Sequence, residues 1–128
     1  ERVALLRTMQ SFNLSAITII HPSAFISKTA IIGEGSQILA NSSVCVDVEV
    51  GAGCIINTSA SVDHDCILGE GVHIGPGAKL AGEISVGDGT FIGTGAIVLP
   101  GLTIGSDVII GCRGCRNKRC GQWCQNGW

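Results

Sequence analysis

The sequence predicts an all-β protein, a parallel β-helix of hexapeptide repeats with about five coils, preceded by a short helix and strand. From His21 to Ile110, every sixth residue is aliphatic through fifteen consecutive blocks, and no insertion interrupts them. The fourth residue of each block is mostly small, and glycine often opens a block. A short period kept over so many blocks is typical of a solenoid, in which each repeat adds one side to a coil.

The six-residue period follows from strand geometry. Successive side chains on a strand point to opposite faces, so the fourth and sixth places look inward together and the fifth looks outward. The first three places are rich in glycine, proline, aspartate and asparagine, which turn a corner. Three consecutive hexapeptides then make the three sides of one coil, whose sixth-place residues stack on those of the neighbouring coils. Cys54 and Cys66 stand in inward fourth places, so we expect them to be reduced packing residues.

The chain before the array has a different pattern. Val3, Leu6 and Met9 recur at three-residue spacing, which predicts a helix over residues 1–13. Residues 16–20 form a short apolar strand candidate. Because a lone helix and strand make a poor independent domain, we interpret residues 1–20 as the remnant of an upstream α/β domain or as an N-terminal cap. Residues 21–111 are then the β-helix domain.

Composition and charge argue against several classes of function. The net charge is −2 and 14% of the residues are charged, so no nucleic-acid-binding or membrane-binding surface is expected. The sequence has no apolar run long enough to cross a membrane and no recognisable signal peptide. These features predict a soluble, cytoplasmic protein with no nucleic-acid or membrane partner.

Most of the candidate chemistry lies in the third coil. His64 occupies a corner between Asp63 and Asp65, and His73 stands in an outward fifth place. A carboxylate beside an imidazole raises its basicity and fixes its tautomer. A histidine whose pKa lies near neutrality is suited to act as a general base. From spacing alone, a simple solvated corner with one surface histidine is an equally good interpretation.

A longer motif around these histidines favours one family. The string INTSASVDHDCILGEGVHIGPGAKLAG (residues 56–82), followed by GDGTFIGTGAIVLPGLTIG, resembles the sugar acetyltransferase branch of the hexapeptide-repeat acyltransferases. The specific part is N-T-S-A-x-V-x-H-D-C with a second histidine nine residues after the first. The resemblance implies a left-handed β-helix. It also implies acetyl-CoA-dependent acetylation of sialic acids or of the amino group of nucleotide-linked amino sugars.

The resemblance also assigns roles to individual residues. It implies that His64 is the catalytic base, that Asp65 orients its imidazole and that His73 lies by the acetyl-CoA thioester. Asn57 matches a supporting hydrogen-bonding residue. The family resemblance further implies a homotrimer, with acetyl-CoA between neighbouring β-helices and a small-molecule sugar as acceptor. No metal is expected.

The length of the coil suggests where the cofactor could run. Pro76, Thr94 and Cys112 follow one another at intervals of one full coil, so they are expected to stack along one corner at about 4.8 Å per coil. Gly93 and Gly95 would let a pantetheine arm approach the backbone closely. We therefore predict that Thr94, Gly93 and Gly95 contact acetyl-CoA.

The end of the chain departs from the repeat. Residues 112–128 form an irregular tail with Cys112, Cys115, Cys120 and Cys124, a spacing that invites a zinc site. Back-translated with permitted codons and shifted by one nucleotide, residues 111–127 give GAGAVVTKDVDNGVRMG, which restores small and aliphatic residues in the fourth and sixth places. Our hypothesis is that this tail is frameshifted, with zinc binding as the alternative.

Two other functions stay open from the sequence. A γ-carbonic-anhydrase-like metalloenzyme shares the trimeric β-helix but needs three histidine ligands on matching coils, whereas His21 and His64 are not separated by a whole number of coils. A non-catalytic trimeric scaffold, or an inactive fragment of an enzyme, is the second alternative. The sequence identifies neither the acceptor nor whether nitrogen or oxygen is acetylated.

Overall fold

The computed structural model describes residues 1–111. The predicted frameshift and its zinc alternative concern residues 112–128, so both lie outside the described residues. Within residues 1–111, no helix is long and apolar enough to span a membrane.

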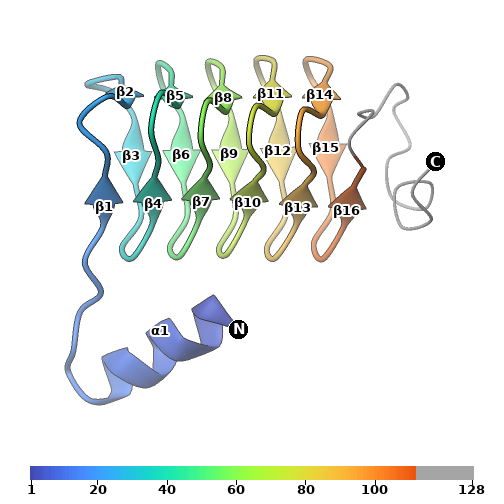
Figure 1. The fold of residues 1–128 in the computed structure, drawn as a ribbon. Helices are drawn as coiled ribbons and strands as arrows, with labels where there is room; N and C mark the ends of the chain where they lie inside the picture. Colours follow the sequence, from blue (N-terminus) through green and yellow to red (C-terminus); the bar gives the residue numbers. More distant parts are fainter. Residues whose placement is uncertain (112–128) are drawn as a thin grey trace.

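Helix α1 (Arg2–Ser11) is followed by strands of two residues each, which wind into a regular solenoid (Figure 1). The strands are β1 (Ile19–Ile20), β2 (Phe25–Ile26), β3 (Ile31–Ile32), β4 (Gln37–Ile38), β5 (Ser43–Val44), β6 (Glu49–Val50), β7 (Ile55–Ile56), β8 (Ser61–Val62), β9 (Ile67–Leu68), β10 (His73–Ile74), β11 (Lys79–Leu80), β12 (Ser85–Val86), β13 (Phe91–Ile92), β14 (Ile97–Val98), β15 (Thr103–Ile104) and β16 (Ile109–Ile110).

Every third strand pairs in parallel, which divides the solenoid into three sheets. Sheet A has the order β1-β4-β7-β10-β13-β16, sheet B β14-β11-β8-β5-β2 and sheet C β15-β12-β9-β6-β3. Paired residues are always one full coil apart: His73, for example, is in register with Ile55 on one side and Phe91 on the other. This pairing confirms the parallel β-helix with three sides per coil, and its left-handed sense stays a prediction.

The ladder begins one strand before the predicted start at His21. β1 pairs with β4, and the Ile19 N–H donates to the Ser36 carbonyl over 2.9 Å. Ile20 stands in the same six-residue register as the sixth-place residues that follow it. Residues 19–20 are therefore part of sheet A. Whether residues 1–20 are a domain remnant or a cap stays a prediction.

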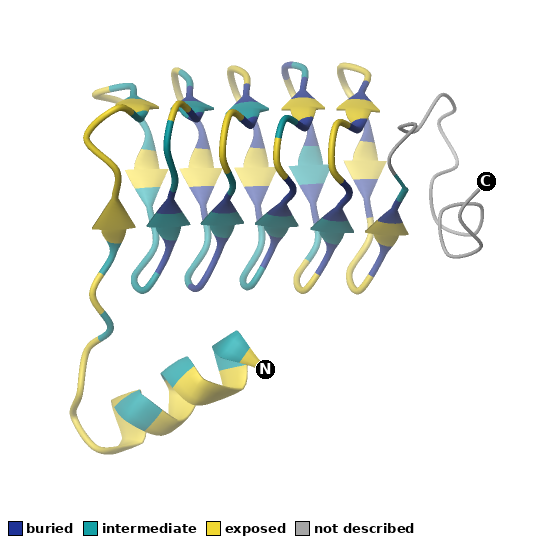
Figure 2. Cartoon of the chain, in the orientation of Figure 1, coloured by how far each residue is buried: buried dark blue, intermediate teal, exposed yellow. Residues whose placement is uncertain are grey.

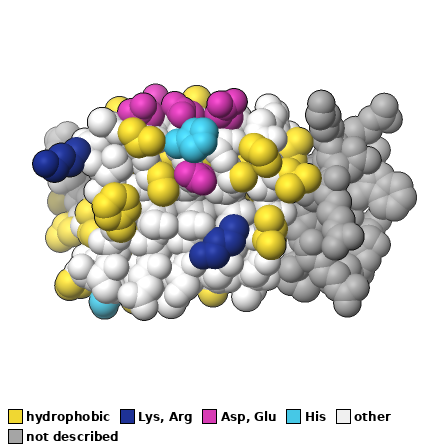
Figure 3. Space-filling model, turned by 90° about the horizontal axis from the view of Figure 1, so that it is seen from above, with side chains coloured by type: hydrophobic (Ala, Val, Ile, Leu, Met, Phe, Trp, Pro, Cys, Tyr) yellow, Lys and Arg dark blue, Asp and Glu magenta, His cyan; other side chains and the backbone are white. Residues whose placement is uncertain are grey.

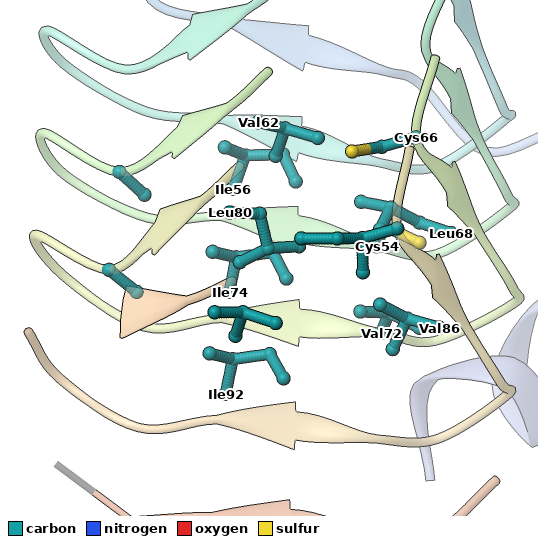
Figure 4. Close-up of a cluster of buried hydrophobic side chains, with 14 of the residues drawn as sticks. Cys54, Ile56, Val62, Cys66, Leu68, Val72, Ile74, Leu80, Val86 and Ile92 are labelled. Atoms are coloured by element: carbon teal, nitrogen blue, oxygen red, sulfur yellow. The ribbon is translucent and has the colours of Figure 1, made fainter. Parts of the chain in front are cut away.

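The core is a stack of the fourth-place and sixth-place side chains (Figure 4). Along each strand of the central coils, a buried residue follows an intermediate or exposed one (Figure 2). Cys54 and Cys66 lie inside this stack with no exposed surface, as predicted, and their thiols donate to the carbonyls of Gly69 (3.0 Å) and Ala81 (3.1 Å). Burial raises the pKa of the Cys54 thiol to about 11 and also raises the pKa of Cys66, so both stay protonated at neutral pH.

The corners share one backbone conformation. Third-place residues from Gly35 to Asp107 have positive φ, and where they are not glycine they are mostly Asp or Asn. The left-handed region costs a side chain little when the residue is Asp or Asn and nothing when it is glycine. Asp65 is one of these residues, with a φ of 57°.

Helix α1 packs along the corner that joins sheet C to sheet A, below the row of corner loops in Figure 1. Leu6 lies against Gly35 and Gly53, where an added Cβ would come within 2.7 Å of a Leu6 methyl carbon. The Arg2 guanidinium donates to the carbonyls of Gly53 and Gly71, each over 3.1 Å. Bare corner glycines therefore let the helix approach the solenoid.

Candidate active site

The corner after β8 holds His64 at the junction of sheets B and C. Its backbone N–H donates to Asp63 Oδ1 over 2.8 Å, and its Nδ1 lies 2.9 Å from Asp65 Oδ2. Since a carboxylate only accepts, Nδ1 carries the proton and Nε2 is the nitrogen left to accept one. Asp65 has a left-handed backbone, with a φ of 57°, and its carboxylate lies beside the ring. The predicted pairing of these two residues is present in the structure.

His64 is exposed, with 47% of its side-chain surface accessible, as expected for a corner residue. The hydrogen bond to Asp65 raises the pKa of His64, and the negative charges of Asp63 and Glu83 add to this effect. The imidazole is thus a stronger base than a free histidine. Figure 3 views the molecule from above the orientation of Figure 1, and it shows a histidine side chain near acidic side chains, with hydrophobic ones on either side.

His73 has different surroundings on β10. Its Nε2 lies 3.1 Å from the Asn57 side-chain nitrogen, while Asn57 Oδ1 accepts the Thr58 N–H over 2.8 Å. The second bond fixes the orientation of the amide, so Asn57 donates to Nε2 and the His73 proton sits on Nδ1. The ring packs edge-on against Phe91, with ring centres 4.9 Å apart.

The charge state of His73 follows from this environment. Burial, and then the positive charge of Arg2, lower the pKa of His73 below its ordinary value. The ring is therefore neutral at neutral pH, whereas the environment of His64 favours the protonated form. Two neighbouring titratable groups whose pKa values are shifted in opposite directions commonly have different roles in catalysis.

A groove of about 490 Å³ lies beside His73, between the N-terminal turn of α1 and the corner that joins sheets C and A. Its lining includes Arg2, Glu70, His73, Asp88 and Phe91. His64 does not line it, because the corner at His64 and the strand of His73 are separated by the width of sheet C. Among the described residues, this groove therefore contains His73 but not His64.

The predicted cofactor contacts lie along the corner that joins sheet A to sheet B. Neighbouring coils stack along this corner as expected: the Gly95 N–H donates to the Pro76 carbonyl of the preceding coil over 2.9 Å. Thr94 and Gly95 are exposed while Gly93 is buried, and a Cβ added at Gly95 would meet no atom of residues 1–111 within 4 Å. This corner follows the strands of His73 and Phe91 but does not line their groove.

Two neighbours of His73 were not predicted from the sequence. Phe91 stands one full coil after His73 in the same outward place, so the coil length alone could have identified it. Arg2 could not have been found in this way, because it reaches the site from a helix outside the repeat.

The metal-site alternative can be compared with the geometry. Within residues 1–111, no group of three or more His, Cys, Asp or Glu side chains is placed to hold a metal ion. His21 instead contacts Ser23, with 2.8 Å between its Nδ1 and the hydroxyl oxygen.

Known proteins provide an independent comparison. Residues 47–82, which include both His64 and His73, match the family described as bacterial transferase hexapeptide (six repeats). The acetyltransferase domain of PglB from Neisseria gonorrhoeae FA1090, in complex with acetyl coenzyme A, is 38% identical with a TM-score of 0.83. The match covers 88% of this chain and 54% of that chain. No curated protein sequence shows a significant match.

Two further solved structures extend this comparison. The GDP-perosamine N-acetyltransferase of Caulobacter crescentus, as a mutant in complex with CoA and GDP-perosamine, is 42% identical with a TM-score of 0.83. That match covers 88% of this chain and 52% of the other. WeeI from Acinetobacter baumannii AYE, at 23% identity and a TM-score of 0.72 over 85% of this chain and 61% of that chain, shares the fold. The chain spans about half the length of the first two relatives.

The regular six-residue ladder and its two outward histidines define a hexapeptide-repeat protein of the transferase type. More particularly, the chain belongs to the hexapeptide-repeat acetyltransferases, and it is similar to structures that include a nucleotide-sugar N-acetyltransferase.

Proposed function

We propose that this chain is the acetyl-transfer part of an acetyl-CoA-dependent N-acetyltransferase that acts on a nucleotide-linked amino sugar. The observation that carries this proposal is the His64–Asp65 pair, in which Nδ1 is held by a carboxylate over 2.9 Å and the ring is exposed. Two relatives support the substrate classes, since one was solved with acetyl coenzyme A and the other with CoA and GDP-perosamine. The second relative favours nitrogen over oxygen as the acetylated atom.

His64 is the base in the proposed reaction. Its Nε2 accepts a proton from the acceptor amine as the amine nitrogen attacks the acetyl carbonyl, and Asp65 stabilises the imidazolium that forms. When the thioester C–S bond breaks, the imidazolium gives this proton to the leaving sulfur, so that CoA departs as the free thiol and His64 is neutral again. Acetyl-CoA, when bound, supplies the activated acetyl thioester. The raised pKa of His64 strengthens it as a proton acceptor, provided that the pH leaves it unprotonated before the reaction.

His73 and the corner of Thr94 would hold acetyl-CoA. The neutral His73 ring can offer its Nδ1–H as a hydrogen-bond donor near the thioester without bringing a positive charge, because Asn57 already occupies Nε2. Thr94 and Gly95 are exposed, and the described residues leave open space around Gly95, which fits an extended pantetheine arm that passes Gly93. These residues therefore fit the cofactor.

A complete site would need two subunits. Because sheet C separates His64 from His73, we propose a homotrimer in which His64 of one subunit faces His73 of its neighbour. Exposed apolar residues surround the His64 corner, namely Val46, Ile67 and Leu99. Such side chains would be covered by a neighbouring subunit. A cytoplasmic location stays a prediction from the sequence.

The proposal is tested by following thiol release from acetyl-CoA in the presence of GDP-perosamine and of other nucleotide-linked amino sugars. His64→Ala should lower kcat by about 10²- to 10⁴-fold, the range for loss of a general base. His21→Ala is the matched control, since His21 is also an exposed corner histidine, and it should retain full activity. Equal activity of wild type and His64→Ala would refute the proposal. Failure of the wild type to bind acetyl-CoA in a calorimetric titration would favour the scaffold alternative.

A further inference from the structure

The second place of each corner carries a side chain in every block of the array except one. Among the fifteen second-place residues, Gly82 alone is glycine, and it stands one full coil after His64. The two residues are therefore stacked in neighbouring coils at the junction of sheets B and C. The Glu83 N–H donates to the His64 carbonyl over 2.9 Å and locks the two corners together.

The backbone does not explain this glycine. The left-handed position of the corner falls on Glu83, with a φ of 60°, and Gly82 itself lies outside that region. Corner glycines in the first place have another reason, since a Cβ at Gly51 or Gly87 would run into the backbone of the next coil. Neither the turn nor the coil spacing therefore requires glycine at residue 82.

The imidazole of His64 is the feature that requires glycine at residue 82. The three atoms nearest to a Cβ added at Gly82 all belong to the His64 ring, namely Nε2, Cε1 and Cδ2, and even the farthest of them lies only 3.0 Å away. Gly82 is buried although its corner faces outward, which fits a ring lying across it. The hydrogen bond from Nδ1 to Asp65 holds the ring in this place.

We propose that Gly82 is a positioning residue for the base: its missing side chain makes the space in which the His64 ring can lie while it is bonded to Asp65. Gly82 acts through His64 and has no chemical role in this proposal. The inference rests on the proposed function for its catalytic consequence, but the geometric claim stands apart from it. Any side chain at residue 82 would force the ring to rotate away from Asp65.

Gly82→Ala is the test, with Gly105→Ala as the matched control, because among residues 1–111 the only atom within 4 Å of a Cβ at Gly105 is a Val108 methyl carbon at 3.8 Å. In Gly82→Ala, the pKa of His64 measured by NMR titration should fall toward its ordinary value as the Asp65 bond is lost. A displacement of the base by about 1 Å should lower kcat by about tenfold or more, while the Kd for acetyl-CoA stays the same. Gly105→Ala should change neither quantity. An unaltered His64 pKa and ring signals in folded Gly82→Ala would overturn the proposal.

A double-mutant cycle separates this role from a general defect in the corner. If the added methyl group clashes with the ring alone, His64→Ala should remove the loss of thermal stability caused by Gly82→Ala. Should Gly82→Ala alone fail to fold, the double variant must fold as His64→Ala does, and its failure would overturn the proposal. Because the NMR titration and the cycle need no activity, an inactive wild type would refute the proposed function without deciding the role of Gly82.

Discussion

At the scale of single residues, the two histidines of the third coil differ in their hydrogen-bond partners and in the direction of their pKa shifts. His64 donates to a carboxylate and has a raised pKa, whereas His73 accepts from an amide, is half-buried and has a lowered pKa. The difference follows from position, because one ring sits on an acidic corner and the other lies on a strand beside Phe91 and Arg2. This contrast is the basis for giving the base role to His64.

Asp65→Asn tests how the base is tuned. Asn tolerates the left-handed backbone of this position, so the corner should keep its shape. The variant loses the carboxylate that raises the pKa of His64, so that pKa should fall. Since the base must be unprotonated, activity in the wild type is lost as the pH drops through the His64 pKa. In Asp65→Asn, this acid limb should move to lower pH, and the plateau kcat should fall by about tenfold or more.

The measurement is a pH profile of kcat/KM for both proteins, with Asp47→Asn as control. Asp47 has the same corner conformation one coil earlier. An acid limb that stays at the same pH in Asp65→Asn would show that this carboxylate does not tune the base.

At the scale of elements, polar side chains inside the solenoid connect one coil to the next. Ser36 is fully buried, donates to the Gly51 carbonyl over 2.9 Å and accepts the Cys54 N–H over 3.1 Å. Thr90 makes the equivalent pair of bonds three coils later, to the Gly105 carbonyl and from the Val108 N–H. These side chains satisfy backbone groups that the corner would otherwise leave buried and unpaired.

Ser36→Ala should therefore lower the free energy of unfolding by about 1–3 kcal/mol, the cost of buried polar groups left without partners. Urea denaturation followed by circular dichroism measures this change. Ser43→Ala, on the outward face of β5, should have little effect, and Ser36→Thr should be tolerated better than Ser36→Ala because Thr90 fills the same role. A loss at Ser43 as large as at Ser36 would refute this account.

The corner glycines under α1 give a second prediction at this scale. Gly53→Ala combines a left-handed backbone with a clash against Leu6. Gly101→Ala has the same backbone conformation, but no atom of residues 1–111 lies within 4 Å of the new Cβ. Gly101→Ala should cost about 1–2 kcal/mol for the backbone alone. Gly53→Ala should cost more, by about 1–3 kcal/mol for overpacking.

Thermal unfolding of both variants measures the difference. A Leu6→Ala background should remove the additional cost at Gly53. Equal costs at the two glycines would mean that the contact of α1 with the solenoid contributes little to stability.

Most strands could be predicted from the six-residue repeat, but specific side-chain contacts could not. A strict period fixes which residues face inward, so the burial of Cys54 and Cys66 and the exposure of His64 followed from register alone. The pairing of Asn57 with His73 depends on side-chain rotamers across two coils, and the period does not encode these. The contact of Arg2 with the corner comes from outside the repeat and could not be predicted from it.

At the scale of the whole molecule, a three-sided prism keeps its two key histidines apart. The corner of His64 and the strand of His73 are separated by sheet C, and the groove beside His73 excludes His64. Three exposed apolar residues, Val46, Ile67 and Leu99, surround the corner of His64. The proposed chemistry therefore requires that neighbouring subunits meet near His64.

A disrupted interface should abolish both assembly and activity. Ile67→Lys places a charge on the outward face of sheet C without touching the core, since Ile67 is 51% exposed. If the proposed trimer forms, sedimentation velocity should show that the variant is a monomer while the wild type is a trimer, with activity lost in parallel and circular dichroism unchanged. Thr103→Lys, on the outward face of the same sheet two coils later, is the control. A fully active Ile67→Lys monomer would rule out a site shared between subunits.

The most direct test of the composite site is subunit complementation between His64→Ala and His73→Ala, each of which should lose most of its activity if both histidines serve the same site. If each site takes His64 from one subunit and His73 from the next, co-refolded random mixtures should regain about a quarter of wild-type activity, as expected for a closed ring with one site at each interface. Neither variant refolded alone should regain any. A mixture that forms trimers and stays as inactive as its parents would contradict the account.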